Sequence, residues 1–293
     1  VLVPGEGSAL GDLVALETVD VGADDIRRRA YEIAQEPLDL TQRPGLRIML
    51  LQNDSREIVV LLVMHYWAMD EWSVVPLLTD LMHAAQARSG AEAPEFTPLP
   101  LRYSDVARWA VARRDAHGAS LTSWCETLDG VPGRVTLPIA LGESGSDAVA
   151  VDIDVDVLRS LRSIEGAGLV SVLHAAFALA LTDLGAGADL AIATMVAGRD
   201  HESTHAMVGA FADVVPIRTR TGSDLATVAR RVQSATVAAL SRSGPSYVDI
   251  VEGAGLPEMR RPQFLVVHHQ VADLGDAGAA LLPVPVGRPW AED

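Results

Sequence analysis

The feature that constrains this chain most is a nine-residue segment between two apolar stretches, His65-Tyr66-Trp67-Ala68-Met69-Asp70-Glu71-Trp72-Ser73. Residues 58–64 before it form an unbroken apolar run, which is typical of a buried strand. Residues 74–85 after it carry apolar side chains at helical spacing, and Ser73 is a residue type that caps helix N-termini. The segment is therefore expected to turn a buried strand into a helix.

Further strands and helices are expected ahead of this corner. They are, in order, a strand over residues 11–20, a helix from Asp24 or Asp25 to about Ala34, and strands over residues 46–51 and 57–64. Pro37 ends the helix, because proline cannot continue a helical hydrogen-bond ladder. The turn residues Asn53-Asp54-Ser55 separate the last two strands, which predicts a hairpin or neighbouring strands.

Behind the corner the same kinds of element recur. The expected elements are a helix to about residue 88, a loop over 89–100, helices over 104–114 and 121–128, a strand over 148–154, a helix from Asp156, an apolar helix over 171–184, strands over 190–196 and 211–218, helices over 225–240 and 247–251, and a strand over 263–269. Proline and glycine break the pattern between residues 130 and 147. Two successive cycles of helices and strands predict an α/β or α+β protein with two lobes, residues 1–140 and 141–293.

Composition excludes several classes of protein. Apolar residues make up 49% of 293 residues, which is enough for a sizeable core. The sequence shows neither an uncharged run of 18 apolar residues nor a signal-peptide pattern, so no membrane association is expected. The single cysteine, Cys125, is interpreted as a small buried hydrophobe. A reducing cytoplasm is the expected location.

The charge of the chain argues against nucleic acid as a partner. The formal net charge is −16, and all 23 basic residues are arginines. A phosphate-binding surface needs a concentrated cationic face, whereas short clusters such as Arg27-Arg28-Arg29 stand among acidic residues. The acidic balance favours solubility or docking onto a basic partner.

Several short blocks resemble the signature blocks of one family, and they occur in the family's order. They are Pro37-Leu38-Asp39-Leu40 followed by Leu46-Arg47-Ile48, the nine residues from His65 to Ser73, Tyr103-Ser104-Asp105-Val106-Ala107-Arg108-Trp109, Ser123-Trp124-Cys125-Glu126-Thr127-Leu128, Gly198-Arg199-Asp200, Val208-Gly209-Ala210-Phe211-Ala212-Asp213, and Pro262-Gln263-Phe264 with Gln270. Each block is weakly specific alone, but the ordered set is strong. The chain is thus identified as similar to the condensation domains of non-ribosomal peptide synthetases, which belong to the chloramphenicol-acetyltransferase-like family.

The resemblance implies a particular architecture. Two acetyltransferase-like lobes would form a V-shaped pseudo-dimer with a tunnel that receives phosphopantetheine arms of carrier proteins. Family members are considerably longer than this chain. We therefore expect the first part of the N-terminal lobe and the last part of the C-terminal lobe to be missing here.

The active-site signature departs from the family pattern at two positions. The family has two adjacent histidines, three variable residues, aspartate and glycine, and its second histidine assists the attack of an amine on a thioester. Tyr66 takes the place of that histidine, and Glu71 takes the place of the glycine. A phenol has a pKa of about 10 and is a poor base at neutral pH. His65 and Asp70, which the resemblance treats as mainly structural, are retained, so no catalytic residue is expected.

One group of condensation-like domains shows this kind of departure. The X-domains of glycopeptide-antibiotic synthetases replace the second histidine, usually by arginine, and the glycine, usually by aspartate. They recruit haem-thiolate cytochrome monooxygenases to the carrier-bound peptide, where aromatic side chains are cross-linked. The resemblance therefore implies a platform for such an oxygenase, beside a peptidyl carrier protein and other synthetase domains, with no cofactor or metal of its own.

Two alternatives stay open at the level of sequence. The first is an active condensation domain that forms amide bonds with Tyr66 or His65. The second is a zinc hydrolase, because His201-Glu202-Ser203-Thr204-His205 spells a zinc-protease motif that requires both histidines on one face of a helix. The segment His268-His269-Gln270-Val271-Ala272-Asp273 also imitates the active-site motif, but it follows the late strand in the other lobe.

Two further residues receive structural interpretations. His174 lies within the apolar helix over residues 171–184 and is interpreted as a satisfied histidine of the core or of a lobe interface. Arg218 ends a predicted strand and is interpreted as a surface or salt-bridge residue.

Overall fold

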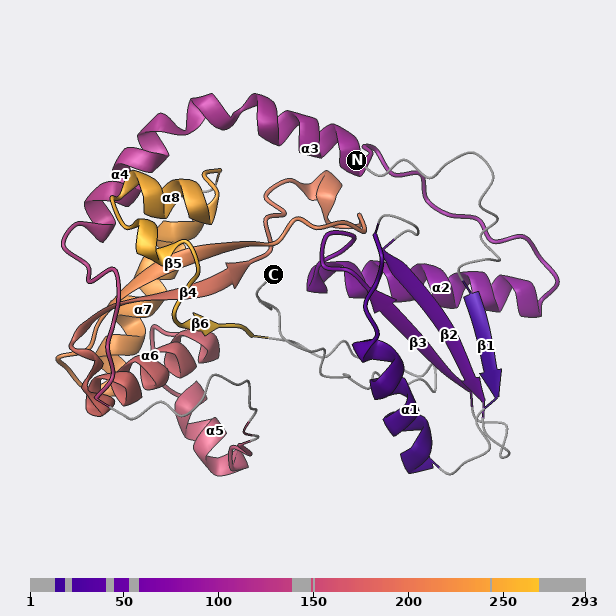
Figure 1. Ribbon diagram of the computed structural model, residues 1–293, viewed down its shortest axis with the longest axis horizontal. Coiled ribbons are helices and arrows are strands. Elements are labelled where there is room, and N and C mark those ends of the chain that lie inside the picture. Colours follow the sequence, from indigo (N-terminus) through magenta and orange to yellow (C-terminus); the bar gives the residue numbers. More distant parts are fainter. Residues whose placement is uncertain are drawn as a thin grey trace. The chain divides into compact units, whose positions relative to one another are not determined.

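The computed structural model describes residues 14–18, 23–40, 45–52, 58–138, 149, 151–242 and 244–268. Contacts between backbones divide the chain into two compact units. The first unit comprises Val1–Pro98, Ala206–Ala210 and Val271–Asp293, and the second comprises Leu99–His205 and Phe211–Gln270. Each unit contains its own sheet with helices packed against it (Figure 1).

The sheet of the first unit has three strands in the order β1-β2-β3. β1 (Val14–Thr18) runs parallel to β2 (Leu46–Gln52), and β2 runs antiparallel to β3 (Ile58–Met64) with Leu46 opposite Met64. The three strands predicted from the alternation and the apolar runs are therefore confirmed. The turn at Asn53-Asp54-Ser55 lies outside the described residues.

α1 (Ala23–Gln35) covers one face of this sheet. The core between them consists of Ile26, Ala30, Ile33, Ala34, Leu51, Leu61 and Val63. The guanidinium of Arg47 closes the end of the helix, because it donates to the carbonyl oxygens of Ile33 at 3.0 Å and Pro37 at 3.1 Å. The carbonyl of Ile33 lies in the last turn, where no amide of the helix follows to bond it, and it also accepts the N–H of Glu36 at 3.2 Å. The prediction that the helix ends before Pro37 is confirmed, while the side chains of Asp24 and Asp25 lie outside the described set.

The strand-to-helix corner of the first unit leads through a single 3-10 turn, η2 (Glu71–Ser73), into α2 (Val74–Ser89). The predicted loop follows this helix, since the next helix begins only at Tyr103.

The second unit holds helices on a three-stranded sheet of order β5-β4-β6. Its elements are α3 (Tyr103–Ala112), η3 (Arg114–His117), α4 (Gly118–Leu128), α5 (Val155–Arg162), α6 (Leu169–Leu181), β4 (Asp189–Val196), η5 (Glu202–Thr204), β5 (Asp213–Arg220), α7 (Leu225–Leu240), α8 (Tyr247–Gly253), η6 (Pro257–Met259) and β6 (Leu265–Val266), with the π-helical turn η4 (Thr182–Ala186) after α6. β4 is antiparallel to β5 and parallel to β6. α6 packs on α7, α7 packs on β5, and α4 packs on α8.

The core of the second unit explains why α4 belongs to it. Trp124 and Leu128 on α4 are each 1% exposed and share one apolar cluster with Val172 on α6, Ile217 on β5 and Val228 on α7. Burying side chains of this size contributes about 1.5 to 3 kcal/mol each. The compact units therefore divide at Leu99, whereas the division into acetyltransferase-like lobes, 1–140 and 141–293, stays a prediction about the family architecture.

The prediction of a strand over residues 148–154 is wrong for residues 151–154, which form no strand. Asp154 is instead the N-cap of α5, because its carboxylate accepts the backbone N–H groups of Asp156 at 2.8 Å and Val157 at 3.4 Å. A capping aspartate satisfies amides that have no helical partner. The cap therefore starts the helix at Val155, just ahead of the predicted Asp156.

The strand predicted over residues 263–269 is shorter than expected. β6 contains only Leu265 and Val266. Gln263 does not join the sheet, because its side-chain amide pairs with the backbone of Val135, accepting from the N–H at 2.9 Å and donating to the carbonyl at 2.6 Å.

Arg218 forms an ion pair, as its sequence context predicted. Its guanidinium lies 2.7 Å and 2.9 Å from the two carboxylate oxygens of Asp189 on the neighbouring strand. It also donates to the carbonyls of Thr127 at 2.9 Å and Asp129 at 2.8 Å. The hydrogen bond from Arg218 holds the pKa of the Asp189 carboxyl below its usual range. This arginine thus ties the end of α4 to the sheet.

Cys125, which was expected to be a small buried hydrophobe, is only partly buried.

Residues Leu169–Ala186 are long and apolar enough to cross a membrane by length and composition alone. Val172, Ala175 and Ala178 within them are fully buried in the core of the second unit, which is the packing of a core helix.

His174 is a satisfied core histidine, as predicted. It is 2% exposed, and its Nε2 lies 3.2 Å from Oγ1 of Thr219 on β5. Burial lowers the pKa of the imidazole to about 4, since removing a charge from water is costly.

Replacement of His174 by glutamine is expected to make stability less sensitive to acid. The folded pKa lies below the unfolded value of 6.5, so the unfolded chain takes up the proton first as the pH falls. The destabilisation is absent above pH 6.5, grows toward pH 4 and reaches about 3 kcal/mol. Urea unfolding at pH 7 and pH 4.5 measures this, and an equal loss in His174→Gln and the natural chain would contradict it.

Candidate functional site

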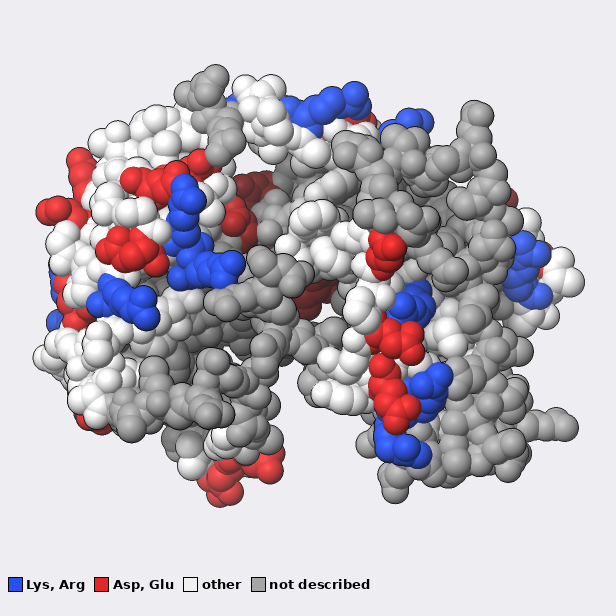
Figure 2. Space-filling view, in the orientation of Figure 1, with Lys and Arg blue, Asp and Glu red and all other residues white. Residues whose placement is uncertain are grey.

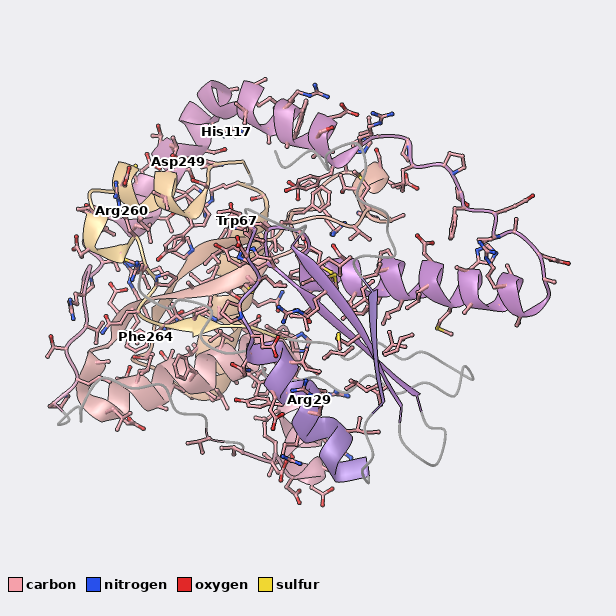
Figure 3. All side chains as sticks on the ribbon, turned by 45° about the vertical axis from the view of Figure 1, so that its right-hand side comes forward. Arg29, Trp67, His117, Asp249, Arg260 and Phe264 are labelled. Carbon is pink, nitrogen blue, oxygen red and sulfur yellow. The ribbon has the colours of Figure 1, made fainter. Side chains whose placement is uncertain are left out.

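The predicted signature lies at the corner between β3 and α2 of the first unit (Figure 3, in which Trp67 is labelled). A tight turn sets its shape: the backbone N–H of Ala68 donates to the carbonyl of His65 at 2.8 Å. The N–H of His65 donates to the carbonyl of Gly45 at 2.8 Å. A Cβ at Gly45 would lie 3.0 Å from the Cβ of His65, so glycine suits this close approach.

Three neighbouring rings occupy the turn. The ring of His65 stacks on Tyr66 at 4.7 Å between centroids and meets Trp67 edge-on at 5.1 Å. Nδ1 of His65 lies 3.2 Å from the backbone N–H of Trp67 and accepts from it. Tyr66 and Trp67 are 66% and 65% exposed. The residue at the family's catalytic position is therefore an exposed phenol beside a histidine whose Nδ1 is engaged by the backbone.

Asp70 acts as a capping residue. Its Oδ1 accepts the backbone N–H of Ser73 at 3.0 Å and lies 2.8 Å from the hydroxyl of Ser73. The sequence predicted that Ser73 would cap the helix, but its side chain makes no capping bond to the helix. The side-chain cap instead comes from Asp70, one turn earlier, because the 3-10 turn η2 precedes α2.

The hydroxyl of Ser73 has a different partner, Gly209. Ser73 is fully buried, and its Oγ lies 3.0 Å from the carbonyl oxygen of Gly209 and accepts the N–H of Gly209 at 3.1 Å. The N–H of Asp70 donates to the same carbonyl at 3.1 Å. These bonds hold the backbone of Ala206–Ala210 against the corner within the first unit.

Glu71 begins η2 directly after the capping aspartate and is half-buried. A negative side chain in the first turn of a helix interacts favourably with the helix dipole. The residue that replaces the family's glycine therefore suits this helix start. His65, Tyr66, Asp70 and Glu71 all belong to the corner between β3 and α2.

Three of the other family blocks meet around Phe211 in the second unit. Gly198 has a φ of +61°, and a Cβ there would lie 1.9 Å from the carbonyl oxygen of Phe211, so the position requires glycine. The guanidinium of Arg199 lies 4.3 Å from the centroid of the Phe211 ring. The ring of Tyr103 meets it edge-on at 5.1 Å. These blocks therefore have structural roles.

The zinc-protease motif does not form its chemical arrangement. Its middle residues form the 3-10 turn η5 instead of an α-helix. Nδ1 of His201 accepts from the N–H of Ser203 at 3.2 Å, and Nε2 of His205 lies 3.1 Å from the carbonyl oxygen of Arg199. Within the described part of the chain no three His, Cys, Asp or Glu side chains are placed to hold a metal ion. The second imitation of the signature lies outside the described residues beyond His268.

Figure 2 shows where charged side chains lie on one face of the molecule. In the face that Figure 2 presents, acidic and basic side chains of the described residues are interspersed, without a continuous basic region among them.

Comparison with known proteins identifies the family. A family profile described as "Condensation domain" matches residues 12–271. The chain belongs to the condensation-domain family. It is 31% identical to a probable non-canonical nonribosomal peptide synthetase of Salinispora arenicola over 75% of the chain, and 29% identical to a dimodular nonribosomal peptide synthase of Bacillus subtilis over 81% of the chain. The chain spans only 3% and 11% of these two relatives.

Solved structures agree with this assignment. The X-domain from teicoplanin biosynthesis is 28% identical, with a TM-score of 0.71 over 83% of this chain and 58% of that structure. The first condensation domain of the calcium-dependent antibiotic synthetase matches with a TM-score of 0.69 over 88% of this chain and 64% of that structure. At 18% identity the second match shows the fold alone. The predicted resemblance and the acetyltransferase-like mixture of helices and strands are thus confirmed.

Ser73→Ala is expected to loosen the segment that contains Gly209. The substitution leaves the N–H of Gly209 without its buried hydroxyl partner, at a cost of about 1 to 3 kcal/mol. Hydrogen exchange at the amide of Gly209 should accelerate. Ser89→Ala is the matched control, because the exposed hydroxyl of Ser89 bonds to the carbonyl of Gln86 at the end of the same helix. Equal protection of Gly209 in both variants would contradict the assigned role.

Proposed function

We propose that this chain is a non-catalytic condensation-type domain that recruits a haem-thiolate cytochrome monooxygenase to a carrier-bound peptide in glycopeptide-antibiotic cross-linking. The observation that carries the proposal is the exposed phenol of Tyr66 at the position of the family's catalytic imidazole. The fold around it is complete enough to cap the helix and to bury Ser73. The scaffold is thus retained where the base is lost.

The remaining histidine does not restore the base. Nδ1 of His65 accepts a backbone N–H, so in the neutral ring the proton resides on Nε2. In that tautomer Nε2 is a donor and has no lone pair with which to take a proton from an amine. Neither ring nitrogen of a neutral His65 is then available as the base that an active condensation domain needs.

The X-domain from teicoplanin biosynthesis supports the recruiting role. It matches this chain at 28% identity, and it has also been solved in complex with OxyB, so a domain of this fold can bind a separate protein. The matched relatives are much longer synthetases. We therefore extend the proposal to a neighbouring peptidyl carrier protein and further synthetase domains, all in the cytoplasm.

The proposed function predicts direct binding of an oxygenase. A purified haem-thiolate monooxygenase encoded beside this synthetase should bind the purified chain saturably, with micromolar affinity, in isothermal titration calorimetry. A condensation domain with an intact two-histidine signature from the same synthetase should bind it at least about tenfold more weakly, which is about 1.4 kcal/mol. Equal binding by both domains, or binding by neither, would contradict the proposal.

A further inference from the structure

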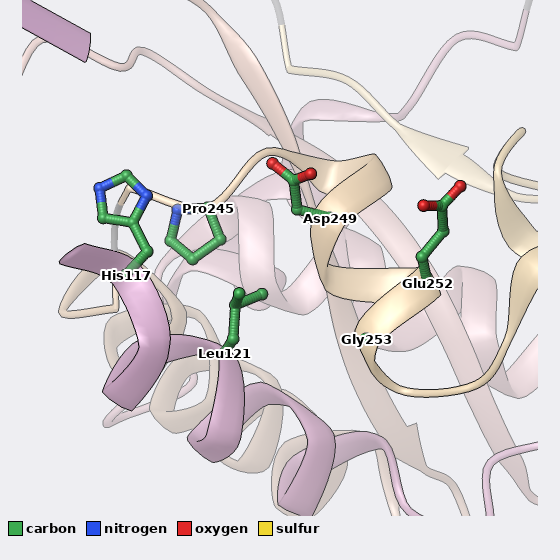
Figure 4. Close-up of a pocket in the computed structure, with 6 residues that line it drawn as sticks. All are labelled: His117, Leu121, Pro245, Asp249, Glu252 and Gly253. Atoms are coloured by element: carbon green, nitrogen blue, oxygen red, sulfur yellow. The ribbon is translucent and has the colours of Figure 1, made fainter. Parts of the chain in front are cut away.

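A groove of about 370 Å³ opens in the second unit between α4 and α8, and none of the signature residues lines it (Figure 4). It is lined by His117, Leu121, Pro245, Asp249, Glu252 and Gly253. The first two come from the start of α4 and the turn before it, and the others come from α8 and the residues ahead of it.

The floor of the groove is apolar. It consists of the half-buried Leu121, the buried ring of Pro245 and the backbone of Gly253. A Cβ at Gly253 would lie 3.7 Å from Sγ of Cys125 and 3.8 Å from Cδ2 of Leu121, so the glycine leaves the space over the floor open. This surface suits the methylene stem of a long side chain.

One wall of the groove is acidic. Asp249 and Glu252 are three residues apart on α8, so their carboxylates share one face of the helix. The hydroxyl of Ser246 donates to Asp249 at 2.7 Å and fixes its orientation. Figure 4 shows both carboxylates along the edge of the groove, with the imidazole of His117 at its other end.

Asp249 also interacts with a third acidic residue, Asp213, which does not line the groove. Asp213 on β5 is partly buried, and burial raises the pKa of its carboxyl, with the charge of Asp249 raising it further. The two acidic groups therefore repel one another. A cation that enters beside Asp249 would relieve this repulsion.

An arginine already contacts the wall from outside. The guanidinium of Arg260 forms an ion pair with Oε1 of Glu252. The side chain of Arg260 is 64% exposed, and an exposed pair of this kind contributes little stability. An incoming guanidinium can therefore displace Arg260 from the carboxylate of Glu252 or share that carboxylate with it.

We propose that this groove receives an arginine side chain of the recruited oxygenase. The inference rests on the proposed function, because that function supplies the partner. The methylene groups of the arginine would cover Leu121 and Pro245, and its planar guanidinium would face Asp249 and Glu252. Arginine suits the site better than lysine, since a guanidinium donates to two carboxylates at once.

The test compares binding of the purified haem-thiolate monooxygenase to three variants by calorimetry. Glu252→Arg should weaken binding by about 10- to 100-fold, because it places a like charge against the incoming guanidinium. Asp156→Arg is the matched control: Asp156 is an exposed carboxylate of the same unit that also pairs with an arginine, Arg159. It should change affinity by less than about twofold.

Arg260→Gln provides the opposite prediction. Removal of the competing guanidinium should tighten binding by about two- to fivefold, a gain that a merely damaged fold would not give. If the natural chain binds normally and the affinity is unchanged in both Glu252→Arg and Arg260→Gln, the role of the groove is contradicted, while the proposed recruiting function is not. If the natural chain does not bind the monooxygenase, both the role of the groove and the proposed function are contradicted. Loss of carrier-protein binding alone in Glu252→Arg would also overturn the choice of occupant.

Discussion

The corner of the first unit depends on the hydrogen bonds of the buried hydroxyl of Ser73. It joins groups 136 positions apart in the sequence by lying within hydrogen-bond distance of Asp70 and of both polar backbone atoms of Gly209. A buried N–H or carbonyl without a partner costs about 1 to 3 kcal/mol, so this serine fixes where Ala206–Ala210 can lie. Because Asp70 caps the turn that follows, the strand, the turn and the helix are held as one piece.

This constraint explains how the signature can differ from the family pattern at two positions and keep its shape. The bonds that define the corner use Asp70, Ser73 and the backbone of His65. None of them uses the side chain at position 66 or requires glycine at position 71. Tyr66 projects into solvent and Glu71 starts a helical turn, so both replacements are tolerated by the fold.

Local patterns in the sequence predicted most helices and strands, whereas contacts between residues far apart in the sequence could not be predicted from it. The helix predicted over residues 225–240 has the same bounds as α7, because its apolar spacing and its capping Asp224 are both local signals. The apolar residues of 148–154 suggested a strand, yet a strand needs a partner, and for residues 151–154 the cap of Asp154 decides the structure instead. Likewise, nothing near Ser73 in the sequence indicates Gly209, and the α4–α8 groove arises only when distant helices pack together.

The proposed function requires that this domain lack a proton acceptor for amide-bond formation. The most direct measurement mixes the purified chain with a peptidyl-loaded donor carrier and an aminoacyl-loaded acceptor carrier and follows the condensed product by mass spectrometry. An intact condensation domain of the same synthetase serves as the positive control. We predict product formation no faster than in the mixture without the chain. Turnover by the natural chain that is abolished by Tyr66→Phe would contradict the account.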